Sequence, residues 1–246
     1  MSDERISRWM GPLGLLTVIA IFIGFGPLSG KEPGQNASGA TVAAYYNSHS
    51  AQSWASVYVV GVGLALLILF VSQLRTVLRN AGGGQTFWPN VVFAAGILLV
   101  TGIVVAGVFE VVLISAAHNH EFAIVKEMNF VSDNNELGFI FGMALLTLST
   151  GASILLNRST NALPKTLGWW SLLVGIVSCL GPAAFFSFLF GMPIWFIATG
   201  FVIGTKARRA TKGLNSEPIV ANLDLGTMQN SGKTLSEESR SQMSDN

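Results

Sequence analysis

Residues 91–117 read VVFAAGILLVTGIVVAGVFEVVLISAA, and Glu110 is the single charged residue among them. An α-helix rises 1.5 Å per residue, so a helix of this length measures about 40 Å and exceeds the roughly 30 Å hydrocarbon core of a bilayer. Within lipid, a helix satisfies its backbone amides internally. This run therefore predicts a membrane-spanning α-helix, and it places the chain among integral membrane proteins.

The composition of the whole chain agrees with this class. Half of the 246 residues are hydrophobic and 11% are charged, whereas soluble domains carry about 25% charged residues. The formal net charge of +1 offers no field that would attract nucleic acid, so the expected partner is the lipid bilayer and not nucleic acid. The single cysteine, Cys179, allows neither an intrachain disulfide nor a cysteine-based metal site.

Five apolar blocks are long enough to cross a bilayer, and the last of them is too long for one helix. It covers 40 uncharged residues, 166–205, and Gly181-Pro182 predicts where it breaks, because glycine caps helix ends and proline suits a first helical turn. The predicted fold is an all-α bundle of six spans, and the short fifth span leaves a re-entrant hairpin as the alternative. The predicted spans are residues 11–29, 54–74, 91–117, 137–156, 167–180 and 183–204.

The basic residues predict which side of the membrane each loop faces. Lysine and arginine accumulate in the cytoplasmic flanks of membrane helices. In the six-span arrangement ten basic residues fall on the side of the two termini, and two, Lys31 and Lys126, fall on the opposite side. Both termini are therefore predicted to be cytoplasmic. The ten basic residues are Arg5, Arg8, Arg75, Arg79, Arg158, Lys165, Lys206, Arg208, Arg209 and Lys212.

The segments outside the spans divide into two outer loops and a tail. The outer loops, residues 30–53 and 118–136, have the composition of short helices. Such helices would anchor at the membrane surface or cap the bundle, and anchoring is the expectation. The bundle is thus assigned to residues 1–205. The polar residues 206–246 contain too few apolar side chains to form a core, and they predict a disordered cytoplasmic tail.

Glu110 is the only acid within a predicted span, and ionisable groups inside spans are functional candidates by default. It lies 19 residues beyond Val91, about 29 Å along the helix, so we expect it near the outer interface. There it would either reach the lipid headgroups or close the floor of a polar outer pocket. The candidate pocket residues, all assigned to the outer side, are Glu110, His49, His118, His120, Tyr45, Tyr46 and Glu136.

Metal binding is the weaker hypothesis for this cluster. Imidazole and carboxylate groups suit zinc or copper, so His118 and His120 are the candidates, but no metal motif or cofactor motif accompanies them. Gly138 and Gly142 form a Gly-x-x-x-Gly pattern that lets two helices approach closely. The expected contact lies within the chain, and the alternative is an interface with a second copy or another membrane protein.

Three short stretches stand out beside the six-span layout. They are FGPL at residues 25–28, NASGATVAAYYNSH at residues 36–49 and LPKTLGWW at residues 163–170. Together they resemble uncharacterised bacterial six-helix integral membrane proteins that are grouped as a domain-of-unknown-function family, over residues 10–205. The resemblance implies a location in a bacterial plasma membrane, and the family has no established activity to transfer.

Three functions are compatible with these observations. The scarcity of polar residues in the spans favours a non-enzymatic accessory, sensor or binding protein. The alternative is a transporter or channel for small molecules or ions, which would need a polar path across the membrane. The third is an interfacial lipid-modifying enzyme that would use the outer histidines and glutamates. No catalytic residue is assigned, and an enzyme is not the expected function.

Overall fold

The structure is a computed structural model that describes residues 9–134, 137–157, 163–180 and 182–216. Every regular element in these residues is helical. Residues 1–207 form one compact unit, and residues 208–246 form a second, of which the end of the last helix is described. The tail predicted from residue 206 onward begins inside this helix, and residues 217–246 lie outside the described residues, so its disorder stays a prediction.

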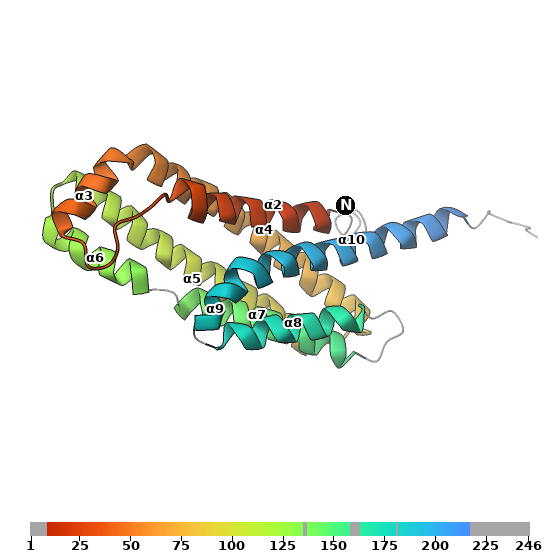
Figure 1. Ribbon diagram of the computed structural model, residues 1–246. Helices are drawn as coiled ribbons and strands as arrows, with labels where there is room; N and C mark the ends of the chain where they lie inside the picture. The colour runs from red at the N-terminus through yellow and green to blue at the C-terminus, as the bar shows by residue number, and fades with distance from the viewer. Residues whose placement is uncertain (1–8, 135–136, 158–162, 181, 217–246) are drawn as a thin grey trace, which may run out of the picture. The chain divides into compact units, whose positions relative to one another are not determined.

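The first unit is built from long helices that lie side by side and from two short helices, α3 and α6, at one end of them (Figure 1). Two short π-helical segments, η1 and η2, interrupt the regular α-helical geometry. The elements are α2 (Met10–Ile23), η1 (Gly24–Leu28), α3 (Gly39–Ser48), α4 (Ser50–Ala81), α5 (Phe87–His118), α6 (Phe122–Asn134), α7 (Leu137–Leu155), α8 (Lys165–Ser178), α9 (Pro182–Phe186), η2 (Ser187–Gly191) and α10 (Met192–Ser216).

Five helical stretches of the described chain are long and apolar enough to cross a membrane. The architecture therefore fits a multi-pass membrane protein, as the sequence predicted. The remaining predicted span corresponds to α8, whose 14 residues measure about 21 Å and fall short of a bilayer core. The five stretches are Met10–Leu28, Ser50–Ala81, Phe87–His118, Gly138–Leu155 and Ala183–Lys206.

Glycine residues bring α5 and α7 close together. A methyl group added at Gly142 would lie 2.5 Å from the Cα and N atoms of Leu99 on α5, and one added at Gly138 would lie 3.3 Å from the Cα atom of Gly102. Both distances are shorter than an ordinary van der Waals contact. The Gly-x-x-x-Gly pattern of the sequence therefore faces a helix of the same chain, and the missing side chains permit this approach.

The helix α8 runs antiparallel to α7. Gly168, near the start of α8, lies against Leu155 at the end of α7, and Gly175, one turn from the end of α8, lies against Leu148. At successive contact points the residue number therefore increases along α8 and decreases along α7. The two helices lie side by side in Figure 1 as well.

The break predicted at Gly181-Pro182 separates α8, which ends at Ser178, from α9, which begins at Pro182. Just beyond it, the hydroxyl of Ser187 in η2 lies 2.7 Å from the hydroxyl of Ser178 and donates to the carbonyl oxygen of Val174 at 3.1 Å. These bonds fasten the return segment to α8, and they provide buried partners for the two serine side chains.

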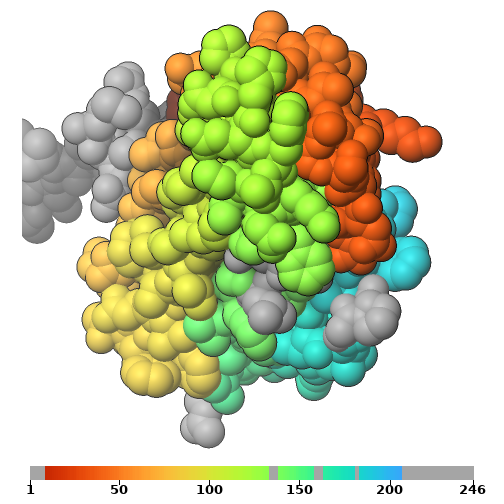
Figure 2. Space-filling model, turned by 90° about the vertical axis from the view of Figure 1, so that its left-hand side faces the viewer, coloured from red at the N-terminus to blue at the C-terminus, as the bar shows by residue number. Residues whose placement is uncertain are grey.

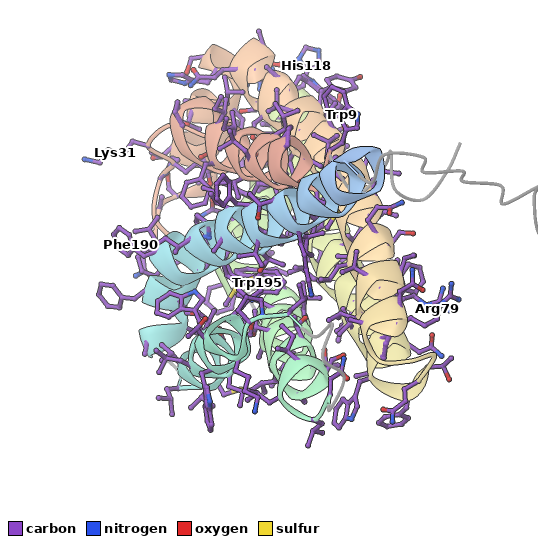
Figure 3. All side chains as sticks on the ribbon, turned by 90° about the vertical axis from the view of Figure 1, so that its right-hand side faces the viewer. Trp9, Lys31, Arg79, His118, Phe190 and Trp195 are labelled. Atoms are coloured by element: carbon purple, nitrogen blue, oxygen red, sulfur yellow. The ribbon has the colours of Figure 1, made fainter. Side chains whose placement is uncertain are left out.

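Aromatic side chains fill the centre of the bundle. Trp195 of α10 lies among the helices (Figure 3) and is fully buried. Its indole N–H donates to the hydroxyl of Ser171 on α8 at 2.7 Å. Phe70 of α4 and Phe196 of α10 stack edge-on with centroids 5.1 Å apart. A methyl group added at Gly14 on α2 would lie 2.9 Å from the carbonyl oxygen of Phe196. The helices α2, α4, α8 and α10 therefore meet around one core.

The helices α3 and α6 cover one end of the bundle, which faces the viewer in Figure 2, and we call this pair the cap. Val42 and Tyr46 of α3, Val125 of α6, and Leu113 and Ala117 of α5 belong to a small buried core at this end. The two outer loops thus form helices that pack on α5, which is the capping arrangement. Their anchoring at a membrane surface stays a prediction.

Candidate functional site

A cavity of about 760 Å³ lies within the first unit, beside the cap. Its walls come from η1, α4, α5, α7, α9 and η2, and the side of the cap contributes Ser132 of α6 and Glu32 of the loop before α3. Small-molecule sites in proteins commonly have volumes of about 300–1,000 Å³, and the spaces between the helices of a bundle are frequent locations for them. The cavity has the size of a ligand site.

Two glycines enlarge this cavity. A methyl group added at Gly61 on α4 or at Gly107 on α5 would meet no other atom within 4 Å, and both residues line the cavity. By contrast, a methyl group added at Gly63, two residues further along α4, would lie 2.9 Å from Ile21 on α2. Gly61 and Gly107 therefore face open space, and any larger side chain at either position would occupy part of the cavity.

Glu110 of α5 lines the cavity, and its Oε2 atom accepts a hydrogen bond from the Tyr46 hydroxyl at 3.0 Å. Tyr46 belongs to the cap and is 1% exposed. Burial raises the pKa of the Tyr46 phenol above its ordinary value of 10.0, and the negative charge of Glu110 raises this pKa further. The hydroxyl is therefore a neutral donor at physiological pH, and it links the cap to the cavity wall.

Tyr45, the neighbour of Tyr46, holds the C-terminal end of η1 against the cap. Its hydroxyl donates to the backbone carbonyl of Ser29 at 2.6 Å, and its ring stacks on His49 with the centroids 4.5 Å apart. Burial raises the pKa of the Tyr45 phenol, and the negative charge of Glu32 adds to this effect. Tyr45 is thus a structural donor, since its hydroxyl is engaged by backbone.

The three histidines that the sequence grouped with Glu110 lie elsewhere. His49, His118 and His120 are exposed, and none of them lines the cavity. His118 follows Glu110 by eight residues, about 12 Å along α5. Within the described residues, no three His, Cys, Asp or Glu side chains lie close enough together to hold a metal ion. Glu136, the last predicted pocket residue, lies outside the described residues.

Sequence reasoning missed several residues of this site. Glu32 and Ser56 line the cavity, and the Ser56 hydroxyl also donates to the carbonyl of Gly24 in η1 at 2.9 Å. A usable signal was present in Gly61 and Gly107. Glycine inside a helix costs about 1 kcal/mol relative to alanine, so each of these glycines indicates a packing or functional reason. Only the contacts of the folded chain show that both face a space.

The rim of the cavity is apolar. Phe25 of η1, Val104 and Val108 of α5, and Phe185 of α9 line the cavity, and all four are exposed. They belong to the stretches that are apolar enough to cross a membrane. In a bilayer such an opening faces hydrocarbon, so a ligand that dissolves in lipid would reach the cavity sideways.

No family model matches the chain, and no curated protein or solved structure is significantly similar to it.

Proposed function

We propose that this protein is a multi-pass membrane protein that binds a lipophilic small molecule in the cavity beside its cap, as a non-enzymatic accessory, sensor or binding protein. The observation that carries this proposal is the cavity of about 760 Å³ with largely apolar walls, into which no side chain extends from Gly61 and Gly107 and which is lined by Glu110, whose carboxylate accepts a hydrogen bond from Tyr46. Ligand sites combine apolar walls with a few placed polar groups in this way.

Binding is better supported than catalysis. General acid–base chemistry needs a proton donor or acceptor within hydrogen-bond reach of the reacting atom, commonly a histidine beside a carboxylate. Among the described residues, those that line the cavity include no histidine, lysine or cysteine, and the one donor on Glu110 is the buried phenol of Tyr46. A lipid-modifying reaction that uses the outer histidines would have to occur away from Glu110.

Binding is also better supported than transport. A transporter needs polar groups that face a path through the membrane. The hydroxyls of Thr147 and Thr150 on α7 are buried and instead donate to carbonyls of their own helix, to Met143 at 2.9 Å and to Leu146 at 2.7 Å. The hydroxyl hydrogen of each of these two threonines is therefore used inside α7.

The proposal includes a topology of six crossings with both termini in the cytoplasm of a bacterium. It is supported by the ten basic residues on one side and two on the other, and by the antiparallel course of α8 along α7. Reporter fusions after Lys31, Lys126 and Lys206 should report outside, outside and inside. A fusion after Lys126 that reports inside would reject this topology.

The binding site is tested by filling the cavity. The protein is placed in lipid nanodiscs and exposed to a photoreactive twelve-carbon alcohol, and labelled peptides are identified by mass spectrometry. Labelling should concentrate on residues 103–112 of α5 and be displaced by unlabelled dodecanol. The variant Gly107→Leu should lower displaceable labelling about tenfold, equivalent to about 1.4 kcal/mol of binding energy.

Ala94→Leu is the matched control, because it adds a side chain to an exposed position of the same helix outside the cavity. It should label like the unmodified protein. Equal displaceable labelling of Gly107→Leu and the unmodified protein would show that the alcohol binds elsewhere, and the proposed site would be rejected.

A further inference from the structure

We infer that the ligand carries a cationic nitrogen at one end of an apolar body, and that this nitrogen pairs with Glu110. The inference rests on the proposed function, because it names the chemical class of the molecule that the cavity would bind. A protonated alkylamine and a quaternary alkylammonium both have this form.

The charge of the cavity lining favours a cation. Glu32 and Glu110 both line the cavity, and the described lining residues include no lysine, arginine or histidine. The carboxylates of this lining repel an anionic headgroup, such as that of a fatty acid. They attract a cation, and the attraction is strongest where water and lipid headgroups are excluded.

The bonding of Glu110 leaves room for such a partner. Its Oε2 atom accepts from Tyr46 at 3.0 Å, and no basic side chain in the described part of the chain forms an ion pair with it. A carboxylate in a membrane helix is costly unless it is paired or solvated. Since the described chain supplies one neutral donor and no counter-charge, a cationic ligand would supply the missing charge.

The shape of the cavity fixes the orientation of the ligand. Ile103 also lines the cavity and lies seven residues before Glu110 on α5, which is about 10 Å closer to the other end of the helix. Leu64 of α4 and Phe188 of η2 extend the wall with apolar side chains. The nitrogen would lie at Glu110 beside the cap, and the alkyl body would run along α5 away from the cap.

Three probes with the same chain length test this inference. Dodecyltrimethylammonium, dodecanol and dodecanoate are compared as competitors of the photoreactive alcohol, in nanodiscs and below their micellar concentrations. The ammonium probe should compete at about tenfold lower concentration than the alcohol, because its full positive charge is attracted to the carboxylate in a site that excludes water, whereas the alcohol carries no net charge. Dodecanoate should be the weakest of the three.

Two carboxylate variants locate the charge. Glu110→Gln should still bind dodecanol, which shows that it folds, but should lose the preference for the ammonium probe. Glu32→Gln should keep most of that preference. Loss of the preference in Glu32→Gln alone, or an unmodified protein that binds alcohol and ammonium equally, would overturn the inference and leave the proposed function standing. If no probe competes in the unmodified protein, the proposed function fails as well.

Discussion

Replacing Gly142 with alanine tests the contact between α5 and α7. The added methyl group would lie 2.5 Å from two backbone atoms of Leu99, and an ordinary contact needs about 3.5 Å, so the helices must separate locally by about 1 Å. Overpacking of this kind costs about 1–3 kcal/mol. Alanine regains about 1 kcal/mol of helix propensity. We therefore expect a net loss of up to about 2 kcal/mol in the free energy of unfolding.

The same substitution at Gly107 should have the opposite sign. A methyl group there meets nothing within 4 Å, because Gly107 faces the cavity. The gain in helix propensity is then the only effect, and the free energy of unfolding should rise by about 0.5–1 kcal/mol. Gly142→Ala and Gly107→Ala thus form a matched pair in which the chemical change is identical and only the surroundings differ.

Both variants can be measured by reversible unfolding in mixed micelles, with the helical circular dichroism signal followed against the mole fraction of the denaturing detergent. The helix-propensity gain is common to both variants, so the difference between them should equal the overpacking cost of about 1–3 kcal/mol. If Gly142→Ala is as stable as Gly107→Ala, the two helices do not pack through Gly142, and the position of α7 against α5 is refuted.

Three further predictions concern the cap and the core. Tyr46→Phe should make the free energy of unfolding depend less on pH in the alkaline range. The folded-state pKa of Tyr46 lies above its ordinary value of 10.0, so the neutral phenol stabilises the fold below about pH 10. This contribution is lost as the pH rises further. Unfolding of the variant and of the unmodified protein, measured between pH 8 and pH 11, checks this. Identical slopes of the free energy of unfolding against pH would contradict it. Trp195→Phe should lower the free energy of unfolding by about 1–3 kcal/mol, since it leaves the buried Ser171 hydroxyl without its indole donor and opens a void. An unchanged melting temperature in thermal unfolding would disprove this packing. Gly39→Ala should loosen the cap, because a methyl group there would collide with the backbone carbonyl of Phe122; faster hydrogen exchange in α3 and α6 is the expected signature, and unchanged exchange would count against this contact.

The sequence determined the membrane class and most helix positions, because hydropathy and helix breaking are local properties of the chain. The run around Glu110 became α5, the loop with Tyr46 became a short helix, and the predicted break is matched by the end of α8 at Ser178 and the start of α9 at Pro182. The predicted fifth span, residues 167–180, has the same length as α8 (Lys165–Ser178) and is displaced from it by two residues at each end, because the exact ends of a helix depend on its caps and return turns.

Only the tertiary structure decided which residues surround Glu110. Sequence grouped it with three histidines because they share one side of the membrane, but α5 carries His118 about two turns beyond it, and the nearest donor is Tyr46, 64 residues away in the chain. The cavity depends on glycines of two different helices, Gly61 and Gly107, facing one space. A stretch of sequence reveals which residues avoid water, but the partners of a side chain depend on the rotation and crossing of packed helices, and those are set by long-range contacts.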